Sequence, residues 1–207
     1  MSKGSLFIVS GPSGVGKGTI VKRVTEARDD IFLSISCTTR APREGEADGV
    51  TYYYITDEEF KKRIADGYFI EWERYVNHYY GTPAQPVLEA GIQGKSTILE
   101  IEVGGAAKAK ERYPDAVMVF VLPPSVAELK RRLMTRDSGN AVAMAAIEAR
   151  MARAREEYQW IDRYDYVIIN SDLDEAVAAL GTIIDAEASR VKNNAVLIEK
   201  IKEEQFI

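Results

Sequence analysis

A glycine-rich turn at residues 11–19 constrains this chain more than any other segment. It reads GPSGVGKGT and lies between an apolar run, residues 5–10, and an amphipathic stretch that follows it. This order predicts a buried strand, a tight turn and a helix. Glycines let consecutive backbone N–H groups point inward at a polyphosphate, the helix start adds positive potential, and Lys17 can reach the outer phosphates. The turn therefore predicts a nucleoside triphosphate site, because a purely structural turn does not require a lysine and glycines at these spacings.

The composition favours a globular chain with a substantial core. The chain has 207 residues, of which 46% are hydrophobic, and a formal net charge of −5. The negative charge argues against a broad nucleic-acid-binding face, and no apolar run is long enough to cross a bilayer. The single cysteine, Cys37, excludes an internal disulfide framework and is expected to be a packed side chain. We therefore expect a cytoplasmic protein that binds neither nucleic acid nor membrane.

Strand-like and helix-like segments alternate along most of the chain, which predicts an α/β fold with a parallel sheet covered on both faces. Two capping boxes, starting at Thr56 and Ser125, mark helix starts. Residues 36–83 interrupt the alternation and are expected to form a small β-rich lobe, with strands at 51–55, 69–75 and 78–81 and a helix at 56–66. Core strands are expected at residues 5–10, 32–36, 96–100, 116–121 and 166–169. Core helices are expected at residues 19–28, 106–113, 125–134, 142–158 and from 173 into the C-terminal tail.

Two arginines form the first of three further clusters. Arg40 and Arg43 are three residues apart, and Pro42 between them stiffens the chain. Two guanidinium groups can grip a second phosphate bidentately. In isolation such a pair is more often solvated surface charge, so both interpretations stay open.

The second cluster combines Glu71 with Tyr52 and Tyr80. An ionised carboxylate only accepts hydrogen bonds, so Glu71 can take two parallel bonds from adjacent donors such as N1 and N2 of guanine. Adenine offers no such pair of donors. The tyrosine hydroxyls can donate to a phosphate, although a tyrosine-rich strand is more often core or rim.

The third cluster is Glu100-Ile101-Glu102, at the end of a core strand. Ligands of open α/β sheets lie beyond the carboxyl ends of the strands, so both glutamates are expected on one strand face, in the site or at its edge. One of them can assist Mg²⁺ through water. A solvated strand end is the alternative interpretation.

The order of these segments resembles the guanylate kinase family over nearly the whole chain. The resemblance is carried by residues 11–19, 36–43, 69–72, 79–82, 100–102 and 167–170. It implies a P-loop three-layer fold with a parallel central sheet, a small mixed β-rich GMP-binding lobe and a helical lid. The implied reaction is phosphoryl transfer from ATP to GMP, and also to dGMP, with Mg²⁺ as cofactor. The implied division is a kinase core of residues 1–35 and 84–190 with a lid at about 134–150, the lobe at 36–83, and a C-terminal helical tail at 191–207.

The family's functional residues carry over by matched position. The implied ATP-binding residues are Gly11, Pro12, Ser13, Gly14, Val15, Gly16, Lys17, Gly18, Thr19 and Asn170. The implied GMP-binding residues are Ser36, Arg40, Arg43, Tyr52, Glu71, Tyr80, Thr82 and Glu102. The implied catalytic residues are Lys17, Arg132, Arg136 and Arg150. Thr19 and Glu100, acting directly or through water, are implied for the metal.

The chain departs from the family pattern at several positions. Gly18 stands where a serine or threonine usually follows the loop lysine, Glu100 and Glu102 replace two aspartates, and Gly104 replaces a glutamine. The route of metal coordination therefore stays open. Two other functions also stay open, a phosphopeptide-binding module of the same fold and a kinase for another phosphorylated metabolite. The sequence is compatible with both a monomer and a homodimer.

Overall fold

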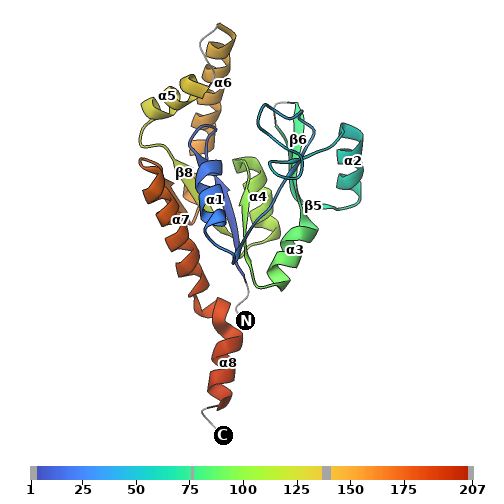
Figure 1. Ribbon diagram of the computed structural model, residues 1–207, viewed down its shortest axis with the longest axis vertical. Helices are drawn as coiled ribbons and strands as arrows, with labels where there is room; N and C mark the ends of the chain where they lie inside the picture. Colours follow the sequence, from blue (N-terminus) through green and yellow to red (C-terminus); the bar gives the residue numbers. More distant parts are fainter. Residues whose placement is uncertain (1–3, 76, 137–140, 205–207) are drawn as a thin grey trace.

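The computed structural model describes residues 4–75, 77–136 and 141–204. Its centre is a five-stranded parallel sheet with the strand order β2-β7-β1-β8-β9 (Figure 1). These strands are β1 (Leu6–Ser10), β2 (Ile31–Leu33), β7 (Ser96–Glu100), β8 (Val117–Leu122) and β9 (Tyr166–Ile169). β1 lies in the middle and leads directly into the glycine turn. The turn therefore lies at the centre of the carboxyl edge of the sheet, where open α/β sheets bind ligands.

Helices cover both faces of this sheet, because successive side chains of its buried strands point to opposite faces. Phe7 and Val9 of β1 pack into a large core with α1, α5, α6 and α7, whereas Ile8 packs into a second core with α3 and α4. These helices are α1 (Lys17–Glu26), α3 (Ala84–Ile92), α4 (Val103–Arg112), α5 (Val126–Arg136), α6 (Ala141–Tyr158) and α7 (Leu173–Ala188). The three layers confirm the α/β fold that the alternation predicts.

A second, mixed sheet lies beside the central one, and its strand order is β4-β3-β6-β5. Its elements are β3 (Cys37–Thr38), β4 (Tyr53–Tyr54), α2 (Asp57–Ala65), β5 (Phe69–Tyr75) and β6 (His78–Pro83). Phe60 of α2 forms a small core of its own with Cys37 and Phe69. Figure 1 shows this sheet and α2 to one side of the main body. Cys37 is fully buried, as expected of a packed cysteine.

The C-terminal segment forms a separate helix. After α7 the chain passes through a 3₁₀ turn, Val191–Asn194, into α8, Ala195–Glu204. α8 buries none of its residues and projects away from the body of the molecule (Figure 1). In the ranges that the structure describes, every helix is too short or too polar to span a membrane.

Both predicted helix starts have the expected hydroxyl cap, and most predicted elements begin or end within a few residues of the observed ones. The Thr56 hydroxyl accepts from the N–H of Glu59 at 3.1 Å, and the Ser125 hydroxyl accepts from the N–H of Glu128 at 3.0 Å. The strand predicted at 51–55 is shorter, since only Tyr53–Tyr54 pairs with β3. Residues 137–140 of the predicted lid lie outside the described residues.

One helix was not predicted, and two expectations about the elements are wrong. Helix α3 is present although the pattern gave no signal for it; its only proline, Pro86, lies in the first turn, where a missing N–H is tolerated. The last core helix does not continue into the tail, because Arg190 is extended and ends it. Glu102 is not on the strand face of Glu100: β7 ends at Glu100, and Glu102 is the N-cap residue of α4.

Candidate active site

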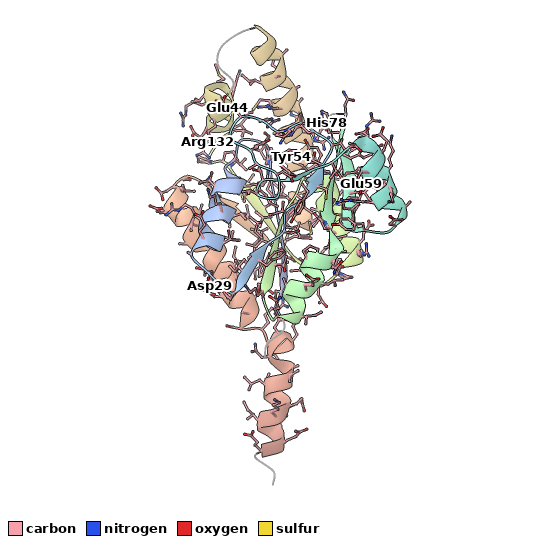
Figure 2. The ribbon with its side chains drawn as sticks, turned by 45° about the vertical axis from the view of Figure 1, so that its right-hand side comes forward. Asp29, Glu44, Tyr54, Glu59, His78 and Arg132 are labelled. Carbon is pink, nitrogen blue, oxygen red and sulfur yellow. The ribbon has the colours of Figure 1, made fainter. Side chains whose placement is uncertain are left out.

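A cavity of about 650 Å³ opens at the carboxyl edge of the central sheet and is lined by residues of both sheets. The predicted site residues that line it are Pro12, Ser13, Gly14, Gly16, Lys17, Gly18, Thr19, Ser36, Arg40, Arg43, Tyr52, Glu71, Tyr80, Glu100, Glu102, Arg132 and Arg150. Gly11, Val15, Thr82 and Asn170 are buried next to the lining. The side chain of Arg136 lies outside the described part of the chain. Figure 2 shows Arg132 and Tyr54 in the half of the molecule that is farther from α8.

The glycine turn has a backbone that side chains would disrupt. Gly14 and Gly16 have φ values of 89° and 95°, in the left-handed region, and a Cβ on Gly11 would lie 2.3 Å from the carbonyl oxygen of Val121. Gly16 is also the N-cap residue of α1. The turn therefore passes close to the sheet and directs the start of α1 toward the cavity, as a phosphate cradle requires.

Lys17 is buried against the turn that precedes it. Only 8% of the residue is exposed, and its ammonium group donates to the backbone carbonyl oxygens of Gly11 and Pro12. These bonds hold the positive charge inside the cradle. A triphosphate entering the turn would meet the ammonium group and the first N–H groups of α1 together.

Asn170 and Arg132 fix the outer side of the turn. The Asn170 amide donates to the carbonyl oxygen of Val15 at 2.7 Å, and a Cβ on Gly16 would lie 2.5 Å from that amide nitrogen. Arg132 donates to the carbonyl oxygens of Val15, at 3.3 Å, and of Asn170, at 2.9 Å, while Glu128 accepts from its Nε at 2.8 Å. The resemblance implied that Asn170 binds ATP; in the structure its side-chain amide bonds to the turn.

Glu100 and Thr19 bring hard oxygen atoms to the same wall. The Glu100 carboxylate lies 3.4 Å from where a Cβ on Gly18 would be, so the absence of a side chain at Gly18 leaves space beside this carboxylate. Glu100 is exposed to the cavity, and the protein atoms around it raise its pKa by partial loss of hydration, whereas Lys17 lowers the pKa and Glu102 raises it. Oxygen ligands with room for water suit Mg²⁺, so these side chains fit the predicted metal. In the described residues, no group of three or more acidic, histidine or cysteine side chains forms a complete cage for an ion.

One end of the cavity, where the sequence analysis expects the base to bind, is built around Glu71. Glu71 is only 6% exposed, and the Thr82 hydroxyl donates to its Oε1 atom at 2.7 Å. The hydroxyl oxygens of Thr82 and Ser36 are 3.3 Å apart. Burial raises the pKa of Glu71 to about 7, while the Thr82 hydrogen bond lowers it and nearby Glu73 raises it. A Cβ on Gly105 would lie 2.7 Å from Oε2, so the first turn of α4 is shaped to admit this carboxylate.

Arg40, Tyr52 and Tyr80 meet at the other end of the lobe. The Arg40 guanidinium lies 5.5 Å from the centre of the Tyr52 ring, and the Tyr52 and Tyr80 rings are 5.9 Å apart, edge to face. Burial raises the pKa of the Tyr52 hydroxyl, and Glu100 and Glu102 raise it further, so this group remains a hydrogen-bond donor. One guanidinium and two phenols thus form a donor set for a phosphate.

Glu46 organises this donor set, and the sequence analysis missed it. Its carboxylate pairs with Arg40 at 2.8 Å, accepts from the Tyr54 hydroxyl at 2.9 Å, and accepts from the N–H of Arg43 at 2.8 Å. The Arg40 guanidinium holds the pKa of Glu46 at about 2. The available signal was its spacing three residues after Arg43, which matches the observed turn from the Glu46 N–H to the Arg43 carbonyl, 3.1 Å.

The fold and the site together define a P-loop nucleotide-binding protein with a separate lobe for a second ligand. The guanylate kinase family model matches residues 3–187. The guanylate kinase of Symbiobacterium thermophilum is 49% identical, covering 97% of this chain and 94% of its own length. That of Caldanaerobacter subterraneus subsp. tengcongensis is 45% identical, covering 98% and 97%.

A solved structure agrees with these relatives. The crystal structure of guanylate kinase from Anaplasma phagocytophilum superimposes with a TM-score of 0.78 at 32% identity, covering 93% of this chain and 90% of that one. The chain belongs to the guanylate kinase family.

Proposed function

We propose that this protein transfers the γ-phosphoryl group of ATP to GMP, giving ADP and GDP. One observation carries the proposal: the glycine turn with Lys17 and the lobe carboxylate Glu71 open onto the same cavity. One ligand is then held by main-chain amides at a helix start, and the other by a carboxylate and an arginine. Two bound nucleotides would face each other across a single space, which is the arrangement that direct phosphoryl transfer needs.

The acceptor end favours guanine by its hydrogen-bonding pattern. Ionised Glu71 accepts from N1–H and from the exocyclic amino group, and Ser36, adjacent to Thr82, offers a hydroxyl for the base. Arg40, Arg43, Tyr52 and Tyr80 would donate to the monophosphate. Because Glu46 restrains Arg40, the guanidinium is oriented in advance and loses less entropy when the phosphate binds.

Positioning and charge neutralisation supply most of the proposed catalysis. A phosphate oxygen of GMP attacks the γ-phosphorus in line with the leaving ADP oxygen, and no protein nucleophile is required. Lys17 and the amides of the turn stabilise the charge on the transferred group. Arg132 and Arg150 line the same cavity and would approach this charge from the helices α5 and α6. Arg136, at the end of α5, is a further candidate by its place in the sequence.

Mg²⁺ is the implied cofactor of this reaction. Thr19 and Glu100 would hold it, directly or through water, and a bound ion would neutralise part of the charge on the phosphates. A cytoplasmic location remains our inference, since the single cysteine is buried and reduced. A phosphopeptide-binding role explains less, because it leaves the complete glycine turn and Lys17 without a use.

A coupled ADP-release assay with GMP, AMP, CMP and UMP as acceptors tests the proposal. GMP should be the preferred acceptor. The change Lys17→Ala should lower kcat on the order of 10²- to 10³-fold, because it removes a charge that acts in the transition state. Lys22→Ala is the matched control, since Lys22 lies on the same helix, is mostly exposed and pairs with Glu26 at 3.7 Å. Equal turnover of GMP and AMP, or normal turnover by the Lys17 variant, contradicts the proposal.

A further inference from the structure

Glu73 is a second carboxylate of β5 that lines the cavity and that the proposed chemistry leaves unused. It lies two residues after Glu71, so both side chains point to the same face of the strand. Its Oε2 atom is shielded from solvent and has no hydrogen-bond partner in the part of the chain that the structure describes. A buried acceptor without a donor is costly. Because Glu73 lines the cavity, a ligand there can donate to the carboxylate oxygen that no described group of the protein satisfies.

The register of the lobe sheet places Glu73 between the two ends of the acceptor site. Glu71 lies opposite Thr82, at the base-reading end, whereas Glu73 lies opposite Tyr80, at the phosphate end. These two positions are about 7 Å apart along the strand. In a nucleoside monophosphate, the ribose joins the base to the phosphate. Glu73 therefore borders the space that the ribose of the acceptor would cross.

Gly104 provides the space for this carboxylate. A Cβ on Gly104 would lie 2.1 Å and 2.4 Å from the two carboxylate oxygens of Glu73. Gly104 is in the first turn of α4 and has no left-handed backbone angle that would itself demand glycine. The glycine that replaces the family's glutamine thus has a structural role: it lets Glu73 come close to the N-terminus of α4, where a negative charge is stabilised.

We propose that Glu73 accepts a hydrogen bond from the ribose 2′-hydroxyl of the acceptor nucleotide and so makes the enzyme prefer GMP to dGMP. This inference rests on the proposed function, because it assumes a nucleoside monophosphate in the cavity. A carboxylate only accepts, and the 2′-hydroxyl is a donor that dGMP lacks. A hydrogen bond to a charged group is worth roughly a 10- to 100-fold change in binding.

The ratio of kcat/KM for GMP to kcat/KM for dGMP measures this contact. The wild-type ratio should be about 10 or more. In Glu73→Ala it should fall to within about twofold of unity, through a loss for GMP rather than a gain for dGMP. Removing Glu73 also relieves its repulsion of Glu71, but that effect acts on both nucleotides and cancels in the ratio. Glu89→Ala, at an exposed position on α3, is the control for loss of one carboxylate.

A second variant leaves the Glu73 carboxylate in the protein and only moves it. Gly104→Ala should push the carboxylate aside while favouring the helical backbone of α4, so a lower ratio cannot be ascribed to unfolding. Gly181→Ala in α7 is the matched control, because a Cβ there meets nothing within 4 Å. The ratio should fall in Gly104→Ala and stay at the wild-type value in Gly181→Ala.

The outcomes separate this inference from the proposed function. If the wild-type protein phosphorylates neither GMP nor dGMP, the proposed function fails. If it phosphorylates both equally well, or if Glu73→Ala keeps the wild-type ratio, only the role of Glu73 fails. IMP provides a third comparison, because it keeps the 2′-hydroxyl but lacks the exocyclic amino group of guanine. If Glu73→Ala changes the ratio of kcat/KM for GMP to that for IMP but leaves the ratio for GMP to dGMP unchanged, Glu73 contacts the base and the inference is overturned.

Discussion

Glu71 shows how one residue can be prepared for a ligand at a cost to the fold. Its carboxyl group is almost completely buried, and Thr82 supplies the hydroxyl that donates to its side chain. Burial raises its pKa to about 7, compared with an ordinary value of 4.5. The ionised form, which is the form that can accept from guanine, is therefore disfavoured in the free protein near neutral pH.

This raised pKa predicts a specific pH dependence of stability. A carboxyl whose pKa is higher in the folded state has no effect on the free energy of unfolding below about pH 4.5, where it is protonated in both states. Above about pH 7, where it is ionised in both states, it lowers the free energy of unfolding by about 3 kcal/mol. Glu71→Gln removes this penalty. The free energy of unfolding of the variant minus that of the wild type should therefore rise by about 2 to 3 kcal/mol between pH 5 and pH 8, as measured by urea unfolding.

Exposed Glu89 supplies the control, since Glu89→Gln should give a difference that is nearly constant with pH. Protonation of Glu71 should also raise the KM of the wild type for GMP as the pH falls below about 7. In Glu71→Gln the KM should be high at every pH, because the amide presents a donor to guanine's own donors. A pH-independent difference in stability would show that Glu71 ionises as an exposed carboxylate does.

Single residues also mark the limit of the sequence analysis. The spacing of Arg40 and Arg43 was compatible with a phosphate grip and with solvated surface charge, and it gave no indication that Glu46 restrains both arginines. A glutamate in a charged loop is usually solvated. Its role became visible only when the fold of residues 38–54 brought its carboxylate between Arg40 and Tyr54.

At the scale of elements, α1 begins without a side-chain cap, as the proposed binding of phosphate requires. Its N-cap, Gly16, has no side chain to accept from the first N–H groups, so these groups stay available for a ligand. Gly18, in the first turn of α1, does not have a positive φ angle, so its backbone conformation does not require glycine. A Cβ at Gly18 would make an ordinary contact of 3.4 Å with the Glu100 carboxylate.

Gly18→Ser should therefore be tolerated and should strengthen the metal site. A serine hydroxyl would lie next to Glu100 and add one oxygen ligand, so the Mg²⁺ concentration for half-maximal activity should fall by about threefold or more. Gly18→Ala is the matched control: either residue favours the helix over glycine by about 0.5 to 1 kcal/mol, but alanine adds no oxygen. Titration of activity with Mg²⁺ distinguishes them. A similar shift in both variants would mean that the helix, and not the hydroxyl, is responsible.

The whole molecule consists of two separately packed parts that meet at the cavity. The central sheet has its cores on both faces, and the lobe has its own core around Phe60. α4 connects them, because Lys108 donates to the carbonyl oxygen of Trp72 at 2.9 Å and Arg112 to that of Phe69 at 2.7 Å. α8 belongs to neither part and exposes Val196, along with other apolar residues.

Removal of α8 should leave the enzyme folded. A chain that ends at Asn194 loses a helix without buried residues, so its free energy of unfolding should change by less than about 1 kcal/mol, and its melting temperature by less than about 4 °C. Its kcat should equal that of the full chain. Thermal unfolding and the coupled assay measure both.

A longer truncation provides the contrast. A chain that ends at Arg190 also loses Asn193, whose side chain donates to the Ser5 hydroxyl at 3.1 Å and to the Glu187 carbonyl at 2.7 Å, and should lose about 1 to 3 kcal/mol more. Equal losses in the two truncations would contradict this assignment. Size-exclusion chromatography of the full chain and of the Asn194 truncation would show whether the exposed residues of α8 also join two copies.

The sequence by itself determined the features that depend on neighbours along the chain. The strand, glycine turn and helix at residues 6–26, the two capping boxes and the alternation of β1 side chains all follow from local sterics and from burial with a fixed period. The tertiary structure decided what depends on segments far apart. Only the pairing of β5 with β6 aligns Glu73 with Tyr80, only the packing of α4 on β5 places Gly104 under Glu73, and only the folded lobe turns Glu46 toward Arg40. Local pattern carries no information about such contacts, because their energy comes from groups that meet only after the two sheets have formed.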